Sequence, residues 1–209
     1  LGDVYKRQAT LEYDGTNWTS GGTLGVANYH GSSGGTLTAG WNLGGSPGPG
    51  AAPGRTNTSQ FYDGTSWTAG PSGPTEISSG SGAGPQDAAL AFTNGDASNP
   101  GGNNILYEYD GSSWAVSPAT LGTARRSGGR GGMSATANQA LAMGGRIGTP
   151  ATGVTEEFSL SINTITGAAW ASGGALNTGR HNLAGTGTQT AALAYGGTPP
   201  ITGKTEEYN

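Results

Sequence analysis

Short apolar runs return along the chain at a regular interval, and each of them ends beside glycine. The runs are AGWNLGG (39–45), AALAFTNG (88–95), QALAMGG (139–145) and AALAYGG (191–197). Runs of four to eight residues between turn signals are typical of β-strands, whereas the density of Gly and Pro elsewhere is incompatible with helices of ten residues or more. The pattern predicts an all-β chain with no helix longer than one turn.

An aromatic residue marks another strand in every repeat. The aromatic positions lie about fifty residues apart, at Tyr13, Tyr62, Tyr109, Phe158 and Tyr208, and a tryptophan follows at Trp18, Trp67, Trp114 and Trp170. In three repeats the connecting sequence is YDGTNW, YDGTSW or YDGSSW, in which Asp-Gly favours positive φ and a tight hairpin. A period of this length predicts stacked supersecondary units. We expect four antiparallel strands per unit, in the order Gly-rich, Ala-rich, Glu-Tyr and Trp.

Gly-Gly after the second strand, Tyr on the third and Trp on the fourth resemble the kelch family of β-propellers, over residues 9–209. The resemblance implies a kelch-like β-propeller with about four blade equivalents, forming a fragment of a larger ring. The alternative is a four-bladed ring closed by the two end halves. The blades would be 9–23 (partial), 24–74, 75–122, 123–178 and 179–209 (partial). The aromatic residues recur once in each blade. This strict recurrence favours packing of Trp18, Trp67, Trp114 and Trp170 in buried positions between blades, rather than on a surface that stacks carbohydrate.

The first eight residues, LGDVYKRQ, fit no repeat. They resemble translated adapter read-through at the ends of metagenomic sequences, so we treat residues 1–8 as a non-native leader. A genuine upstream strand is the alternative.

Composition narrows the possible functions. Nine basic and thirteen acidic residues give a net charge of −4, too mild to indicate nucleic-acid binding. No apolar stretch reaches the length of a membrane span. The chain contains no Cys, which excludes thiolate chemistry and the Cys-linked tyrosine of galactose oxidase, another propeller of the kelch type.

The candidate catalytic and metal-binding groups all have simpler interpretations. Turn chemistry explains the Asp of each Asp-Gly pair. Adjacent residues of a strand point to opposite faces, so the paired carboxylates at 156–157 and 206–207 do not suit acid–base catalysis. His30 and His181 stand in no metal-binding spacing. We expect no catalytic residue, metal or cofactor.

Variable loops and basic residues fall on one predicted face. The segments between the Ala-rich run and the aromatic position differ in length from unit to unit, and function concentrates on such loops. Basic residues map to these loops and to the connections between blades, at Arg125, Arg126, Arg180, Arg55, Arg146 and Lys204. Clustered arginines suit carboxylate, sulfate or phosphate groups. The alternative is that these basic side chains are simply exposed to solvent on the loops and bind no ligand.

The sequence therefore favours a non-catalytic binding or adhesion propeller of a secreted, cell-surface or virion protein. It would recognise a protein or an acidic glycan through the variable loops. One alternative is a structural repeat of a phage or bacterial fibre. Another is a non-catalytic part of a carbohydrate-active enzyme.

Overall fold

A computed structural model describes residues 9–47, 54–92, 95–96, 101–129, 139–159, 169–188, 190–199 and 201–208. Residues 1–8, which the sequence predicts to be a non-native leader, lie outside these residues. Within them the chain is all-β and contains no helix, as the sequence predicts. Every strand pairing is antiparallel.

Strands that follow one another in the sequence pair into five successive sheets. Sheet one holds β1 (Leu11–Tyr13) and β2 (Trp18–Ser20); sheet two holds β3 (Ser32–Thr36), β4 (Ala39–Leu43), β5 (Ser59–Tyr62) and β6 (Trp67–Ala69). Sheet three holds β8 (Ser81–Ala83), β9 (Leu90–Phe92), β11 (Asn103–Tyr109) and β12 (Trp114–Arg125). Sheet four holds β13 (Gln139–Met143), β14 (Thr155–Ser159) and β15 (Ala169–Ser172), and sheet five holds β16 (Ala184–Thr188), β17 (Ala191–Tyr195) and β18 (Thr205–Tyr208). A separate ribbon pairs β7 (Ile77–Ser78) with β10 (Gly95–Asp96).

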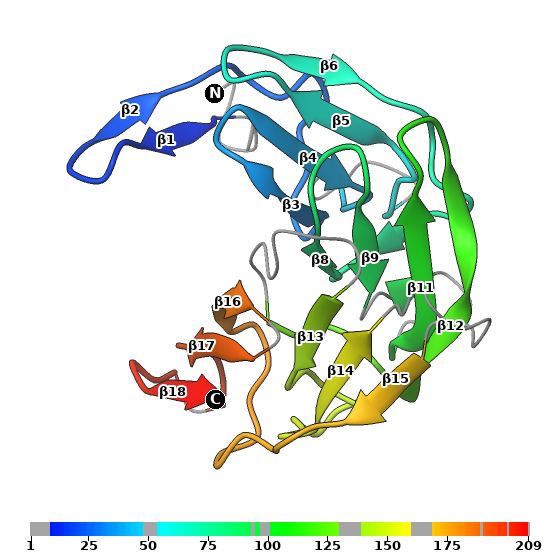
Figure 1. Cartoon of the computed structure of the whole chain (residues 1–209), viewed down its shortest axis with the longest axis vertical. Helices are drawn as coiled ribbons and strands as arrows, with labels where there is room; N and C mark the ends of the chain where they lie inside the picture. The colour runs from blue at the N-terminus through cyan, green and yellow to red at the C-terminus, as the bar shows by residue number, and fades with distance from the viewer. Residues whose placement is uncertain are drawn as a thin grey trace.

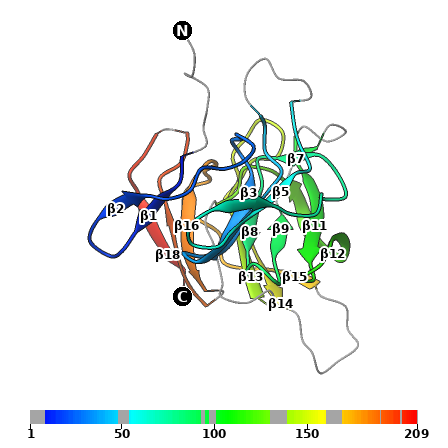
Figure 2. The same ribbon diagram turned by 90° about the horizontal axis from the view of Figure 1, so that it is seen from above.

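The five sheets lie one after another around an open arc (Figure 1). In sheets two, three and five the first strand lies on the inner side of the arc, and later strands lie progressively outward. The β1–β2 hairpin projects from the edge of the molecule in both views (Figure 1 and Figure 2). The gap in the arc lies between this hairpin and sheet five.

The Asp-Gly hairpins share one geometry. In the β5–β6 turn, the Asp63 carboxylate accepts hydrogen bonds from the backbone N–H groups of Thr65 (2.8 Å) and Ser66 (2.7 Å). Gly64 takes a φ of +92°, which explains the glycine at this position. Asp14 and Asp110 bind their own turns in the same way. These hydrogen bonds lower the pKa of all three carboxyl groups, so the turn itself explains these residues.

The Ala-rich strands pack one sheet against the next. On β13, Leu141 and Met143 join a buried cluster with sheet five, whereas Ala140 and Ala142 join a cluster with sheet three. The large side chains of β13 thus point towards the next sheet in the sequence, and the small ones point towards the preceding sheet. This is the alternation that a strand requires. We call these two sides of a sheet its forward and backward faces. A large forward face against a small backward face lets neighbouring sheets approach closely.

Tyrosine hydroxyls also link neighbouring sheets. Tyr62 of sheet two donates a hydrogen bond to Glu12 of sheet one, and Tyr208 of sheet five donates one to Glu157 of sheet four. Both acceptors directly precede the aromatic landmark of their own strand. These hydrogen bonds are the largest cause of the raised pKa values of Tyr62 and Tyr208.

The prediction that the four tryptophans are buried holds only in part. Trp114 is buried (6% exposed), Trp67 is half-buried and Trp18 is 66% exposed, so the prediction for Trp18 is wrong. Each of these rings packs on the tyrosine of its own hairpin, with centroids 5.0–5.2 Å apart. Deeper burial of a tryptophan ring requires contact with the preceding sheet, as Trp114 contacts Trp41 of sheet two. Trp18 belongs to sheet one, which has no preceding sheet among the described residues. The side chain of Trp170 lies outside the described residues, although its backbone pairs with Phe158.

A candidate anion site on the inner side of the arc

A backbone hydrogen-bond chain joins sheets two to five on their inner side. Ser79 N–H donates to His30 C=O (2.7 Å), Ser127 N–H to Ser79 C=O (2.7 Å), and Asn182 N–H to Ser127 C=O (3.0 Å). All four residues have positive φ, between 54° and 63°. Non-glycine residues rarely adopt this conformation, so its recurrence at one register position indicates a common constraint. We call these four residues the inner spine.

The inner spine brings loops from different sheets together. At three of the four spine positions the preceding residue pairs with the residue that follows Gly-Gly: Tyr29 with Ser46, Arg126 with Arg146 and His181 with Thr198. Gly145, the second glycine of sheet four, has a φ of +105°, and a Cβ there would lie 2.8 Å from Arg126 O. Glycine is therefore required for this approach. The β13–β14 loop and the connection between sheets three and four consequently lie side by side.

Three arginine side chains converge on this region. Arg55 lies in the β4–β5 loop, Arg126 at the connection after β12, and Arg146 in the β13–β14 loop, and all three are half-buried. Burial lowers the pKa of Arg126, and repulsion from Arg146 and then Arg55 lowers it further. The Nε atom of each arginine is buried without a hydrogen-bond partner.

These positive charges are not neutralised by the described part of the chain. Arg146 donates through Nη2 to Thr149 C=O (3.2 Å), which is a neutral acceptor. Among the described residues, no ion pair joins Arg55, Arg126 or Arg146 to a carboxylate. Mutual repulsion without a counter-charge favours binding of an anion at this point.

His181 completes the cluster. Burial lowers the pKa of its imidazole, and Arg146 and Arg126 lower it further by repulsion. Nε2 lies 3.1 Å from Thr198 Oγ1, whereas Nδ1 is buried without a hydrogen-bond partner. We call Arg55, Arg126, Arg146 and His181 the cationic cluster. A search for metal-binding spacing misses His181, but its register position, equivalent to Arg126, could have identified it.

Arg125 and Arg180 lie elsewhere. Both side chains are 0% exposed and form ion pairs, Arg125 with Glu156 (3.2 Å) and Arg180 with Glu206 (2.5 Å). Their other hydrogen bonds go to backbone carbonyl groups in or next to the sheet that holds the glutamate, at Val154 and Ala142 for Arg125 and at Gly196 and Lys204 for Arg180. The structure places these two predicted ligand-binding residues inside the protein, where Nη1 and Nη2 of each donate to other groups of the chain and Nε has no hydrogen-bond partner. Each one ties the start of a unit to its second and third strands.

The last predicted binding residue, Lys204, and the paired glutamates lie close to these buried arginines. Lys204 is exposed, and its carbonyl group accepts a hydrogen bond from Arg180 (2.9 Å). Desolvation opposes ionisation of Glu206, but the hydrogen bond from Asn177 N–H and the charge of Arg180 outweigh it, so the pKa of Glu206 is lowered. Glu156 and Glu206 therefore serve the buried arginines, while Glu157 on the opposite face binds a tyrosine.

The described residues contain no group of three or more His, Cys, Asp or Glu side chains arranged to hold a metal ion. They also contain no helix long and apolar enough to cross a membrane. No family model and no curated protein matches the chain.

Proposed function

We propose that residues 9–209 form a kelch-like β-propeller module, with the five sheets as whole or partial blades of a larger ring. The sequential antiparallel sheets and their arrangement around an arc support this proposal (Figure 1). The recurrence of one junction also supports it, because the same strand positions carry the contact between neighbouring sheets. In such an architecture each unit stabilises only its neighbours.

The module is a non-catalytic binding protein that recognises an acidic group of a glycan or protein through the cationic cluster. The observation that carries this function is the convergence of three half-buried arginines from separate loops, without a carboxylate partner among the described residues. Arginine binds carboxylate, sulfate and phosphate groups through two parallel hydrogen bonds. Each charge-assisted hydrogen bond contributes about 1.5–3 kcal/mol, so two or three together give useful affinity.

A glycan array with neutral, carboxylated and sulfated sugars tests this function, at low salt and at 1 M salt. Wild-type protein should prefer acidic sugars and lose them at 1 M salt, where the screening length falls to about 3 Å. The Arg126→Gln/Arg146→Gln variant should lose binding. Lys204→Gln is the matched control, because it removes an exposed charge of the same sign and should retain binding. Equal binding by wild type and the double variant would refute the site.

The proposed localisation is extracellular, either secreted, at a cell surface or on a virion. A structural repeat of a phage or bacterial fibre is the second candidate function. It is favoured by the repetition of one junction along the arc, in which backbone hydrogen bonds at equivalent positions join neighbouring sheets.

A further inference from the structure

Arg126 and Arg146 are held side by side by their own backbones. Arg126 N–H donates to Arg146 C=O (3.1 Å) and Arg146 N–H donates to Arg126 C=O (2.9 Å), so the two residues stand opposite each other in an antiparallel bridge. Opposite residues of such a pair lie on the same face, with Cβ atoms about 4.5–5.5 Å apart. The two side chains therefore start from adjacent points although their charges repel, and among the described residues no carboxylate pairs with either.

A second bridge of this kind fixes His181. Its N–H donates to Thr198 C=O (2.8 Å), and its C=O accepts a hydrogen bond from Thr198 N–H (2.9 Å). When the Thr198 hydroxyl donates to Nε2, Nδ1 carries the hydrogen of the neutral imidazole. Burial, and then repulsion from Arg146 and Arg126, lowers the pKa of His181. This residue therefore supplies a donor at neutral pH and no fourth charge.

Arg55 adds a third guanidinium from a different sheet. It lies in the β4–β5 loop of sheet two, and its charge lowers the pKa of Arg126, after burial and the charge of Arg146. The cationic cluster thus combines three permanent positive charges with donors from the loops of four successive sheets. An anion that satisfies these donors needs more than two acceptor oxygens and more than one negative charge.

These requirements separate three common anionic groups. A carboxylate has two oxygens in one plane and one charge, and a single guanidinium fork can bind both oxygens. A sulfate ester has three terminal oxygens but only one charge. A phosphate monoester has three terminal oxygens and a charge of about −1.5 to −2 at pH 7. Of these groups, the phosphate monoester matches the cluster in both oxygens and charge.

The loop beside the cluster suits a sugar better than a peptide. The β13–β14 loop reads RIGTPATGV (146–154), in which Arg146 is the only charged residue. Its carbonyl groups and threonine hydroxyls offer partners to the hydroxyl groups of a sugar. Ile147 is its only large apolar side chain in an exposed position, which leaves a peptide little apolar area to bury.

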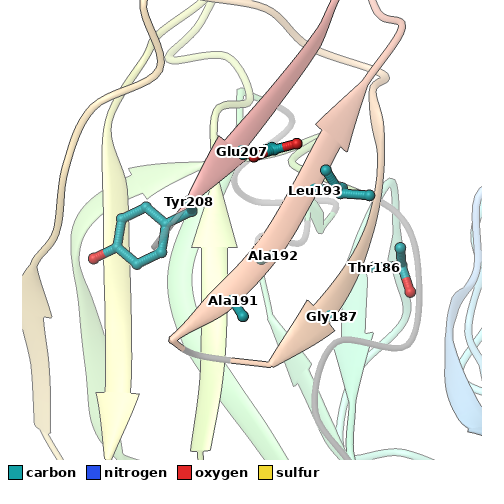
Figure 3. A pocket seen from close by; sticks show the side chains of 7 residues that line it. All are labelled: Thr186, Gly187, Ala191, Ala192, Leu193, Glu207 and Tyr208. Carbon is teal, nitrogen blue, oxygen red and sulfur yellow. The ribbon is translucent and has the colours of Figure 1, made fainter.

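A hollow elsewhere in the structure does not offer this chemistry. It lies on sheet five, has a volume of about 280 Å³ and is shown in Figure 3. Glu207 is the only charged residue that lines it, so an anion placed there would be repelled. A substitution of Glu207 therefore distinguishes binding in this hollow from binding at the cationic cluster.

We propose that the cationic cluster selects a phosphorylated sugar over a sulfated or carboxylated one. Arg126 and Arg146 bind two oxygens of the phosphate ester, Arg55 binds the third, and His181 Nδ1 donates to one of them. This assignment rests on the proposed function, since it requires that the cluster binds an anion.

Three ligands built on one hexose test the selectivity: glucose 6-phosphate, glucose 6-sulfate and glucuronate. Isothermal titration calorimetry at low salt, above the second phosphate pKa of about 6, measures their affinities. Glucose 6-phosphate should bind about tenfold more tightly than either of the others, a ratio that corresponds to roughly 1.4 kcal/mol. Equal or tighter binding of either other ligand, lost in Arg126→Gln/Arg146→Gln, would overturn this inference and leave the proposed function standing. If none of the three binds, or if the double variant binds them as wild type does, both fail.

Single substitutions test the role of each residue. Arg55→Gln should weaken binding of glucose 6-phosphate about tenfold, the same ratio of roughly 1.4 kcal/mol, and that of glucuronate much less, because a carboxylate has no third oxygen. An equal loss for both ligands would contradict this role of Arg55. Lys204→Gln and Glu207→Gln are the controls and should bind glucose 6-phosphate like wild type. A loss in Glu207→Gln would place the ligand in the hollow of sheet five and overturn the proposal.

A short neutral peptide that contains phosphoserine separates a sugar from a protein ligand. It should bind more weakly than glucose 6-phosphate, because the loop offers partners to sugar hydroxyl groups. Tighter binding of the peptide would overturn the assignment of a sugar. Circular dichroism with a strand signal equal to that of wild type establishes that each variant is folded.

Discussion

Replacing Glu156 by glutamine should be one of the most damaging single substitutions in this protein. The Glu156 side chain is 5% exposed and the Arg125 side chain 0%, and Oε1 of the first lies 3.2 Å from Nη2 of the second. Glu156 also accepts hydrogen bonds from the backbone N–H groups of Gly122 (2.6 Å) and Thr123 (3.2 Å). The substitution leaves a guanidinium buried without its counter-charge.

Removal of one partner from a buried ion pair costs about 3–5 kcal/mol. For a chain of this size, each kcal/mol lowers the melting temperature by about 2–4 °C, so Glu156→Gln should lower it by roughly 6–20 °C. Urea denaturation followed by circular dichroism measures the loss directly. Glu207→Gln is the control, since Glu207 is exposed and should change the free energy of unfolding by less than about 0.5 kcal/mol.

A double-mutant cycle separates the ion pair from general damage. In Arg125→Met/Glu156→Gln, the second substitution should cost less than it does alone, because no unpaired charge remains inside the protein. Additive effects of the two substitutions, or a loss below about 1 kcal/mol for Glu156→Gln, would refute the reasoning.

Three further predictions concern turns, glycines and the cationic cluster. Gly145→Ala should destabilise by about 1–3 kcal/mol in thermal unfolding because of its positive φ and its approach to Arg126 O, whereas Gly203→Ala, with nothing within 4 Å, should be neutral. The Asp63 carboxyl has a lowered pKa, so its stabilising contribution is full above the ordinary value of 3.8 and disappears as pH falls through the lower folded value; Asp63→Asn should therefore show a smaller loss of stability on acidification below pH 3.8 than wild type. The pKa of His181 should lie below 6.5 in NMR titration and rise when sulfate is added, because an anion offsets the repulsion from Arg146 and Arg126; a pKa unaffected by sulfate would contradict an anion site here.

Local features of this fold could be predicted from the sequence, because their causes lie within a few residues. The Asp63 turn needs only the carboxylate and the two N–H groups that follow it, and the strand at 139–143 needs only alternation of Ala with larger apolar residues. The unit order in the sheets follows from the same short patterns.

The residues of the candidate site could not be predicted fully from the sequence, because their burial depends on contacts between distant parts of the chain. Arg125 occurs in a basic pair at a connection, where a solvated side chain is the simplest interpretation. Its burial is decided by Glu156, thirty-one residues later, and alternation along β14 does not reveal which face of the strand holds the arginine. The exposure of Trp18 likewise depends on the sheet beside it rather than on its own hairpin.

The inner spine gives this protein an unusual freedom in copy number. Because Ser79 bonds to His30 as Asn182 bonds to Ser127, sheets two to five meet one another through the same backbone groups, although the side chains at these positions differ. Unequal recombination within the gene could therefore add or delete one period of about fifty residues without creating a new kind of boundary. Point mutations in the loops would then change each copy separately, while the hydrogen bonds along the spine keep successive copies in register.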